Sequence, residues 1–117
     1  MEQRGFDIQF TDEVRTFLKG IHREAAAKIT YNVRKVCAGN WDAELFKKLD
    51  GSDGIWELRT HYGGIQYRLL AFWDTEEQRL VVATHGFVKK RWRVPDKEVR
   101  RAVEIRKRYY EQKHKKT

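Results

Sequence analysis

Four ionisable residues near the middle of the chain have spacings that would let them act together on one substrate. Glu57, Arg59 and His61 occupy every second position of segment 55–62. Residues two apart in an extended strand point to the same face, so these three side chains would lie together. Arg68 is a cation inside the next segment, which is largely apolar. All four are candidate site residues.

A basic run follows the last predicted strand, in the stretch THGFVKKRWRVP at residues 84–95. His85 stands at the strand end that leads into it. The candidate ligands of phosphate or RNA in this run are Lys89, Lys90, Arg91, Trp92 and Arg93. Trp92 can stack on a base or pack beside the core, and the whole run can be a solvated connection.

This set of side chains suits phosphate chemistry that needs no metal ion. Guanidinium groups bind phosphate through two hydrogen bonds, and lysines add positive charge where negative charge grows in a transition state. A carboxylate or imidazole can take the proton from a ribose 2′-hydroxyl, and the candidates are Glu57, His61 and His85. We favour His85 over Glu57, because an imidazole has a pKa of about 6.5, whereas a carboxylate beside arginines is a weak base.

Each assignment has a structural alternative. Glu57 and Arg59 can form a surface ion pair, worth about 0–1 kcal/mol. Arg68 can be a structural cation held by a carboxylate, and a lone histidine is more often structural than catalytic. The four histidines and the single Cys37 show no metal-ligand spacing, so we expect neither a metal site nor a cofactor.

Positive charge is concentrated at the C-terminal end of the chain. The formal charge is +8, and residues 1–85 hold 12 Lys and Arg against 13 Asp and Glu. Residues 86–117 hold 13 against 4, a net charge of +9. Such a surface attracts polyphosphates, with an affinity that depends steeply on salt. An acidic protein partner and a merely solubilising tail are the alternatives.

Composition excludes several protein classes. A content of 40% hydrophobic residues argues against disorder, and no apolar run approaches the roughly 20 residues that span a bilayer. The N-terminus lacks the pattern of a signal peptide, and a single cysteine cannot form an internal disulfide. We expect one soluble, cytoplasmic domain over residues 1–117.

Hydrophobic periodicity in the first half predicts a strand followed by helices. FDIQF at 6–10 alternates as a strand does, and Thr11 with the acids after it is typical of a helix start. An apolar stripe at helical spacing is interrupted at Gly20 and continues to Gly39, which predicts a helical hairpin. Residues 40–54 predict a short helical turn followed by a loop.

The second half predicts a mainly antiparallel sheet and a last helix, and therefore an α+β fold. Period-two segments occur at 55–62, 65–73 and 79–87. Alternation along 79–87 would place His85 and Phe87 with Val81 and Ala83. Helices covering one sheet face would leave the other face open for the charged side chains. A C-terminal helix is predicted from Pro95, with residues 111–117 as a frayed basic tail.

Two segments together resemble a known family. IWELRTHYGGIQYRLLAFW at 55–73 and THGFVKKRWRVPDKEVRRA at 84–102 combine WELR, a glycine turn, YR, HGFVKK and a proline before an acidic helix start. Over residues 45–105 this combination resembles the HigB-like, phage-derived branch of the RelE/ParE toxin superfamily. The resemblance implies a small α+β toxin of a type II toxin–antitoxin pair. Such toxins cleave mRNA without a metal ion, usually in the ribosomal A site.

The resemblance also implies roles and partners. By the family pattern, Arg68 contacts the scissile phosphate, Arg59 acts similarly, and Lys89 and Lys90 hold phosphate or ribosomal RNA. RelE carries lysines on the strand where this chain has Ile55 and Glu57, so the general base cannot be transferred by position. The implied partners are mRNA on the ribosome and an antitoxin, expected to be a small helix-turn-helix protein, with no membrane. A ParE-like inhibitor of DNA gyrase and a non-catalytic nucleic-acid-binding domain are the alternative functions.

Overall fold

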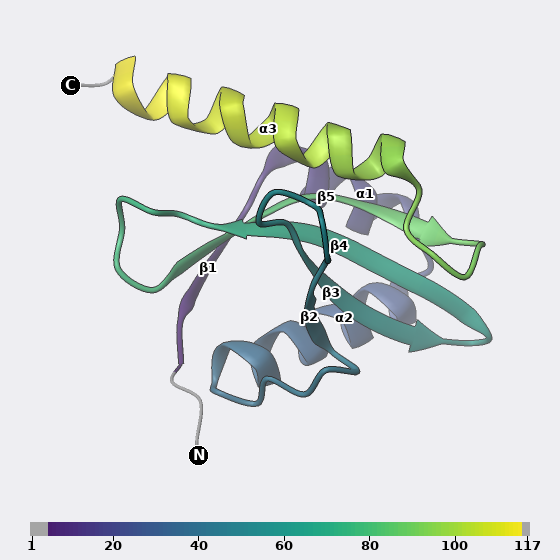
Figure 1. Cartoon of the computed structure of the whole chain (residues 1–117). Helices are drawn as coiled ribbons and strands as arrows, with labels where there is room; N and C mark the ends of the chain where they lie inside the picture. The colour runs from purple at the N-terminus through teal and green to yellow at the C-terminus, as the bar shows by residue number, and fades with distance from the viewer. Residues whose placement is uncertain (1–4, 116–117) are drawn as a thin grey trace.

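A computed structural model describes residues 5–115, which form three helices and five strands (Figure 1). In chain order the elements are β1 (Asp7–Phe10), α1 (Asp12–Gly20), α2 (Arg23–Cys37), β2 (Phe46–Lys48), β3 (Trp56–Tyr62), β4 (Ile65–Trp73), β5 (Leu80–Lys89) and α3 (Asp96–Lys115). The α+β class predicted from the sequence is confirmed.

The strands form one sheet in the order β1-β5-β4-β3-β2. β1 lies parallel to β5, and the other neighbouring pairs are antiparallel. The turn between β3 and β4 uses Gly63 and Gly64, whose φ angles of 59° and 78° lie in the left-handed region that glycine adopts without strain. This turn fixes the register of the hairpin, and that register brings Arg59 directly opposite Arg68.

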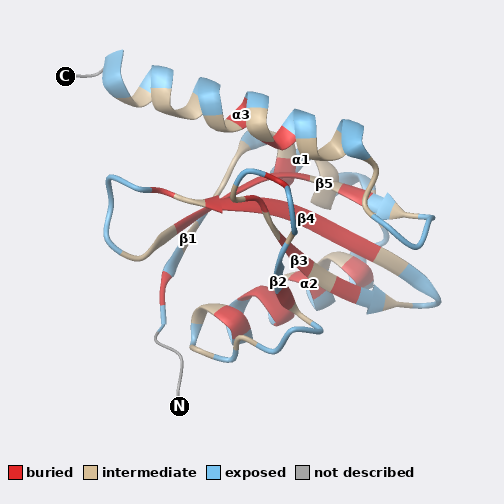
Figure 2. Ribbon diagram, in the orientation of Figure 1, coloured by how far each residue is buried: buried red, intermediate tan, exposed pale blue. Residues whose placement is uncertain are grey.

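Helices cover both faces of the sheet (Figure 1). On one face, Ile29 and Val33 of α2 belong to the same buried cluster as Leu58 of β3. On the other face, Ala102 of α3 belongs to a cluster with Leu70 of β4, so the central strands are buried from both sides (Figure 2). The prediction of one open face was therefore wrong, because the apolar stripe of α3 also needs a partner.

Residues 46–48 form the edge strand β2 instead of the predicted helical turn. Phe46 pairs with Leu58 of β3 and is 3% exposed. Its ring stacks on Trp56 with centroids 4.6 Å apart. The prediction was wrong because a three-residue strand is too short to show a period of two, whereas pairing with β3 buries its one aromatic ring.

A β-bulge in β5 changes which side chains share a face. Leu70 pairs with His85, but the next residue of β4, Ala71, pairs with Ala83, which leaves Thr84 without a direct partner. The extra residue reverses the alternation. His85 and Phe87 therefore lie on the face that α3 covers, and their predicted grouping with Val81 and Ala83 was wrong.

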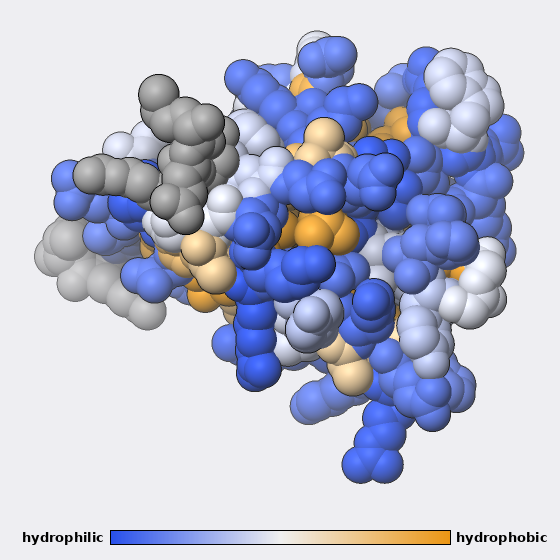
Figure 3. Space-filling model, turned by 90° about the horizontal axis from the view of Figure 1, so that it is seen from below, coloured by the Kyte–Doolittle hydropathy of each residue, from blue (hydrophilic) through white to orange (hydrophobic). Residues whose placement is uncertain are grey.

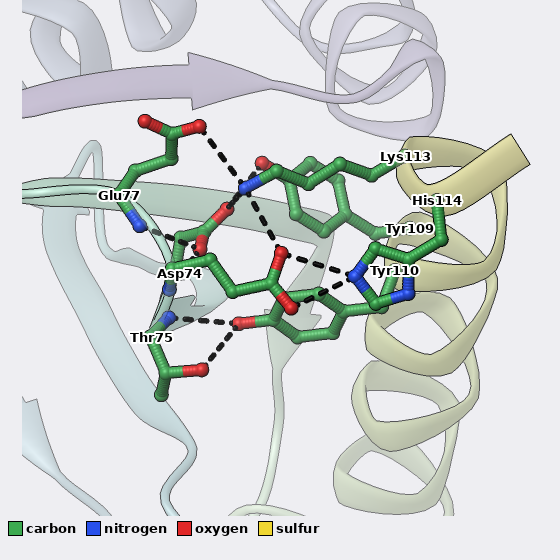
Figure 4. A network of polar contacts seen from close by, with 8 residues as sticks. Asp74, Thr75, Glu77, Tyr109, Tyr110, Lys113 and His114 are labelled. Atoms are coloured by element: carbon green, nitrogen blue, oxygen red, sulfur yellow. Dashed lines mark hydrogen bonds and ion pairs between the residues drawn. The ribbon is translucent and has the colours of Figure 1, made fainter. Parts of the chain in front are cut away.

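A polar network fixes the C-terminal half of α3 to the loop after β4 (Figure 4). The side chain of Asp74 is fully buried, and it accepts hydrogen bonds from Tyr109 Oη at 2.6 Å and from Lys113 Nζ at 2.8 Å. The helix consequently continues to Lys115. The predicted fraying of 111–117 was wrong up to that residue, and the last two residues lie outside the described part of the chain.

The ionisation of Asp74 should make this network sensitive to pH. Burial alone would raise the pKa of the carboxyl group, but hydrogen bonds from Lys113 and Tyr109 outweigh burial and hold the pKa below its ordinary value. Because the pKa is lower in the folded state, the carboxylate stabilises the fold above about pH 4, and this stabilisation is lost as the pH falls further. We expect Asp74→Asn to lower the free energy of unfolding at pH 7 by about 1–3 kcal/mol, measured by urea denaturation.

A matched control for this prediction is Glu77→Gln, since the side chain of Glu77 is 53% exposed and pairs with the same lysine. It should change the free energy of unfolding by less than Asp74→Asn does. The difference between Asp74→Asn and the parent should shrink between about pH 5 and pH 3. A difference that stays constant over this range would show that the Asp74 charge does not stabilise the fold.

Candidate phosphate-binding site

On the sheet face that α3 covers, paired residues of neighbouring strands form three rows across the sheet. Residues directly opposite each other in an antiparallel sheet point to the same face. The rows are Arg59–Arg68–Phe87, His61–Gln66–Lys89 and Lys47–Glu57–Leu70–His85. Segments that are distant in the sequence therefore contribute to one charged surface, at the end of the sheet near the β3–β4 turn.

A buried carboxylate lies between the two arginines. Glu57 is 3% exposed, and its Oε1 atom is 2.9 Å from Arg59 Nε and 3.8 Å from Arg68 Nε. Both contacts are ion pairs rather than aligned hydrogen bonds, because neither Nε has a hydrogen-bond partner within residues 5–115. Glu57 Oε2 also lacks one there. Buried polar atoms are normally hydrogen-bonded, so three atoms without a hydrogen bond in one cluster make this cluster a candidate ligand site.

The facing pair Arg59 and Arg68 lowers the free energy of unfolding, because like charges directly opposite each other in a sheet repel. Arg68 is 3% exposed, and its Nη1 donates to Tyr67 O at 2.9 Å and to Gln66 Oε1 at 3.2 Å. Burial lowers the pKa of the guanidinium group, Glu57 opposes this change, and Arg59 adds to it. Arrangements that oppose stability in this way are expected at functional sites.

Arg59 is the accessible member of the pair. Its side chain is 28% exposed, and its Nη1 donates to the carbonyl oxygen of Ala43 at 3.2 Å.

Lys89 lies close enough to the cluster for its pKa to be affected. Burial lowers the pKa of Lys89, and the positive charges of Arg68, Arg59 and Lys47 lower it further, while Glu57 opposes them. The cluster thus combines four cations with one carboxylate, which suits an incoming phosphate group.

The chain matches a known protein family and resembles two solved structures. Residues 16–107 match the family described as "Phage derived protein Gp49-like (DUF891)". The chain belongs to this Gp49-like family. Its fold is similar to that of an E. coli toxin RelE mutant in the free state, with a TM-score of 0.61 and 17% identity over 86% of this chain and 96% of that chain. The RelBE2 toxin–antitoxin complex from Mycobacterium tuberculosis matches with a TM-score of 0.48 and 24% identity, over 74% and 99% of the two chains.

The family match and the fold similarity agree with each other, and this Gp49-like protein has a RelE-like fold. No curated protein matches it. Within residues 5–115, no helix has the length and apolar character needed to cross a membrane.

His85 of the Gp49-like protein is buried, and both of its ring nitrogens are engaged. It is 1% exposed, with Nδ1 3.0 Å from Thr84 Oγ1 and Nε2 3.0 Å from Glu98 Oε1. Burial lowers the pKa of the imidazole, although Glu98 opposes this. Because a carboxylate oxygen can only accept, Nε2 carries the proton of the neutral ring and donates to Glu98, while Nδ1 faces the hydroxyl group of Thr84. Leu70 separates His85 from Glu57 in their row, so the histidine links β5 to α3 and does not reach the arginines.

The basic run of the Gp49-like protein divides between two surfaces. Lys89 belongs to the charged rows, whereas Lys90, Arg91 and Arg93 line a cavity of about 480 Å³ at the start of α3. Trp92 is 87% exposed, so the alternative that it packs against the core was wrong. An exposed aromatic ring between cations is suited to stacking on a nucleobase.

Two polar members of the rows were not among the residues predicted for the site. Lys47 was missed because the segment 40–54 was interpreted as a helical turn, which gives no strand face to its side chain. Gln66 could have been found, because alternation alone puts it on the same face as Arg68.

Proposed function

We propose that this Gp49-like protein is the toxin of a type II toxin–antitoxin pair and cleaves mRNA on the ribosome in the cytoplasm. The observation that carries this proposal is the pair of facing arginines, Arg59 and Arg68, around the buried carboxylate of Glu57. The family match and the RelE fold support a toxin of the RelE type. In the proposed reaction, a ribose 2′-hydroxyl attacks the adjacent phosphate without help from a metal ion.

The exposure of each side chain suggests the order of events. The scissile phosphate binds the accessible Arg59 and draws its guanidinium group away from Glu57, which opens the buried carboxylate. Glu57 Oε2 then accepts the proton of the 2′-hydroxyl. Arg68, fixed by Tyr67 and Gln66, stabilises the charge that grows on the phosphate. The bond between phosphorus and the 5′-oxygen breaks, and this oxygen takes up a proton from water, so the products are a 2′,3′-cyclic phosphate and a 5′-hydroxyl.

Glu57 is favoured over His85 as proton acceptor, which reverses the preference drawn from the sequence. Glu57 Oε2 has no hydrogen-bond partner within the described residues, whereas both nitrogens of His85 are engaged. His85 is instead proposed to position α3 through Glu98. Contact with RNA on either side of the cleaved bond is assigned to His61, Lys89, Lys90, Arg91, Trp92 and Arg93.

Induced expression in a bacterial host, followed by mapping of new RNA 5′ ends, tests the proposed function. We expect new ends inside translated reading frames, at positions that follow the codon register. Arg59→Ala should abolish most of them, and co-expression of a neighbouring small helix-turn-helix protein, the expected antitoxin, should suppress them. Growth arrest without new RNA ends, accompanied by DNA damage, would instead indicate an inhibitor of DNA gyrase.

The two lysines that begin the basic run should contribute more to binding than to chemistry. Replacing Lys89 and Lys90 with alanine removes two phosphate contacts, so the log–log slope of ribosome affinity against salt should flatten by about one to two units. The rate of cleavage at saturation should fall less than the affinity. A control variant lacking the exposed Lys19 and Lys107 carries the same net charge and should keep the parental slope. Equal slopes for all three proteins would make the basic run a solubilising surface only.

A further inference from the structure

Helix α2 carries a group of cations that the proposed reaction does not use. Lys28, Arg34 and Lys35 are exposed on the helix, and Tyr31 among them is 56% exposed. Residues at spacings of three and four lie on one side of an α-helix, so Lys28, Tyr31 and Lys35 form a stripe about 10 Å long. Together these four residues are the α2 basic surface.

The aromatic ring organises this surface. Lys28 Nζ lies 5.5 Å and Lys35 Nζ 5.6 Å from the centroid of the Tyr31 ring, within the range of cation–π interaction. None of the three cations forms an ion pair within residues 5–115. The single acid of the helix, Glu24, accepts a hydrogen bond from Tyr62 Oη at 2.7 Å. The positive charge of the surface is therefore not neutralised by acids of the helix itself.

The helix beneath the surface is held firmly. Ile29, Val33 and Val36 on its opposite side are buried in the core. The buried amide of Asn32 donates to Thr60 Oγ1 of β3 at 3.1 Å. The cations therefore project from a fixed backbone, which lowers the entropic cost of ordering them around a partner.

We infer that the α2 basic surface is a second RNA-binding surface, which holds structured RNA outside the strand that is cleaved. This inference rests on the proposed function. α2 covers the face of the sheet opposite to Arg68, so no single phosphate group can contact both surfaces (Figure 1). A ribosome-bound enzyme with cations on both sides can touch the mRNA with one face and ribosomal RNA with the other.

The chemistry of the surface fits RNA better than it fits a protein partner. Seen from the side on which α2 lies, the molecule is mostly hydrophilic, with only small apolar areas (Figure 3). A stable protein interface needs an apolar core, whereas binding to an RNA backbone depends on cations. The exposed ring of Tyr31 adds a flat surface for a base.

The test compares the triple variant Lys28→Ala/Arg34→Ala/Lys35→Ala with a charge-matched control. The control removes three exposed cations from other elements, Lys19, Lys48 and Lys107. Affinity is measured over a series of salt concentrations for two probes. One probe is the purified ribosome, and the other is a short duplex that consists of RNA alone. Single-turnover cleavage of mRNA is measured at saturating protein.

The α2 variant should bind both probes at least about 10-fold more weakly at low salt, and the salt slope should fall by about two to three units. The control should behave like the parent, and the α2 variant should retain the parental rate of cleavage at saturation. Tyr31→Leu, which keeps all three charges, should weaken binding several-fold.

Three results would overturn the inference. The first is an α2 variant that binds both probes as tightly as the parent does. The second is an α2 variant that binds ribosomes more weakly but the RNA duplex equally well, which would indicate a ribosomal protein as partner, and the third is an equal loss of affinity in the α2 and control variants. A parental protein that binds both probes through α2 but never cuts mRNA would support the inference and contradict the proposed function. The two claims are therefore separable.

Discussion

Replacing Arg68 with alanine is expected to lower the rate of RNA cleavage about 100-fold or more. Arg68 is fixed by Tyr67 and Gln66, so its charge is already in place when negative charge grows on the phosphate. Preorganised donors of this kind supply much of the stabilisation of a transition state, and their loss falls on the chemical step. Single-turnover cleavage of mRNA on programmed ribosomes measures this step directly.

The control for this experiment must separate chemistry from folding, since Arg68 is buried. Arg68→Lys keeps the positive charge but loses the fork of the guanidinium group, and it should retain part of the activity. Arg59→Ala removes the more exposed arginine and should weaken both binding and cleavage. Thermal unfolding of each variant shows whether it is folded. A folded Arg68→Ala protein that cleaves at the parental rate would mean that the scissile phosphate binds elsewhere.

Glu57→Gln is the second change for which we expect a loss of about 100-fold in cleavage. Glutamine has nearly the same shape as glutamate but cannot accept the proton of the 2′-hydroxyl. Ribosome binding should persist, because the cations around the site remain. The measurement is single-turnover cleavage between about pH 5.5 and pH 8.5, with binding determined in parallel.

His85→Gln is the matched comparison for Glu57→Gln. It removes the contact with Glu98 at the start of α3, so we expect a lower melting temperature and a rate of cleavage within about 10-fold of the parent. If His85→Gln loses its activity while remaining as stable as the parent, and Glu57→Gln stays active, the histidine is the proton acceptor after all.

Much of the site could be predicted from strand alternation alone. The period of a strand is two in any tertiary context, so Glu57 and Arg59 share a face wherever β3 lies. The turn at Gly63 and Gly64 then sets the register that places Arg68 opposite Arg59. These features depend on neighbours in the sequence, which is why the sequence was sufficient for them.

The features that were missed depend on contacts between distant segments. The bulge at Thr84 has no local signature, yet it carries His85 to the face that α3 covers. β2 exists because Phe46 can be buried against β3, and with it Lys47 joins the site. The last turns of α3 are polar, and they are held by Asp74 from 39 positions earlier in the chain. None of these partners can be identified from local periodicity.

Attack by the ribose 2′-hydroxyl can be tested with two mRNAs that differ at one atom. One carries a 2′-hydroxyl at the nucleotide before the cleaved bond, and the other carries a 2′-deoxyribose there. We predict that the first is cut to a 2′,3′-cyclic phosphate and a 5′-hydroxyl, and that the second binds equally well but is not cut. Cleavage of both mRNAs at similar rates, or products that carry a 5′-phosphate, would contradict attack by the ribose at the Arg59–Arg68 site.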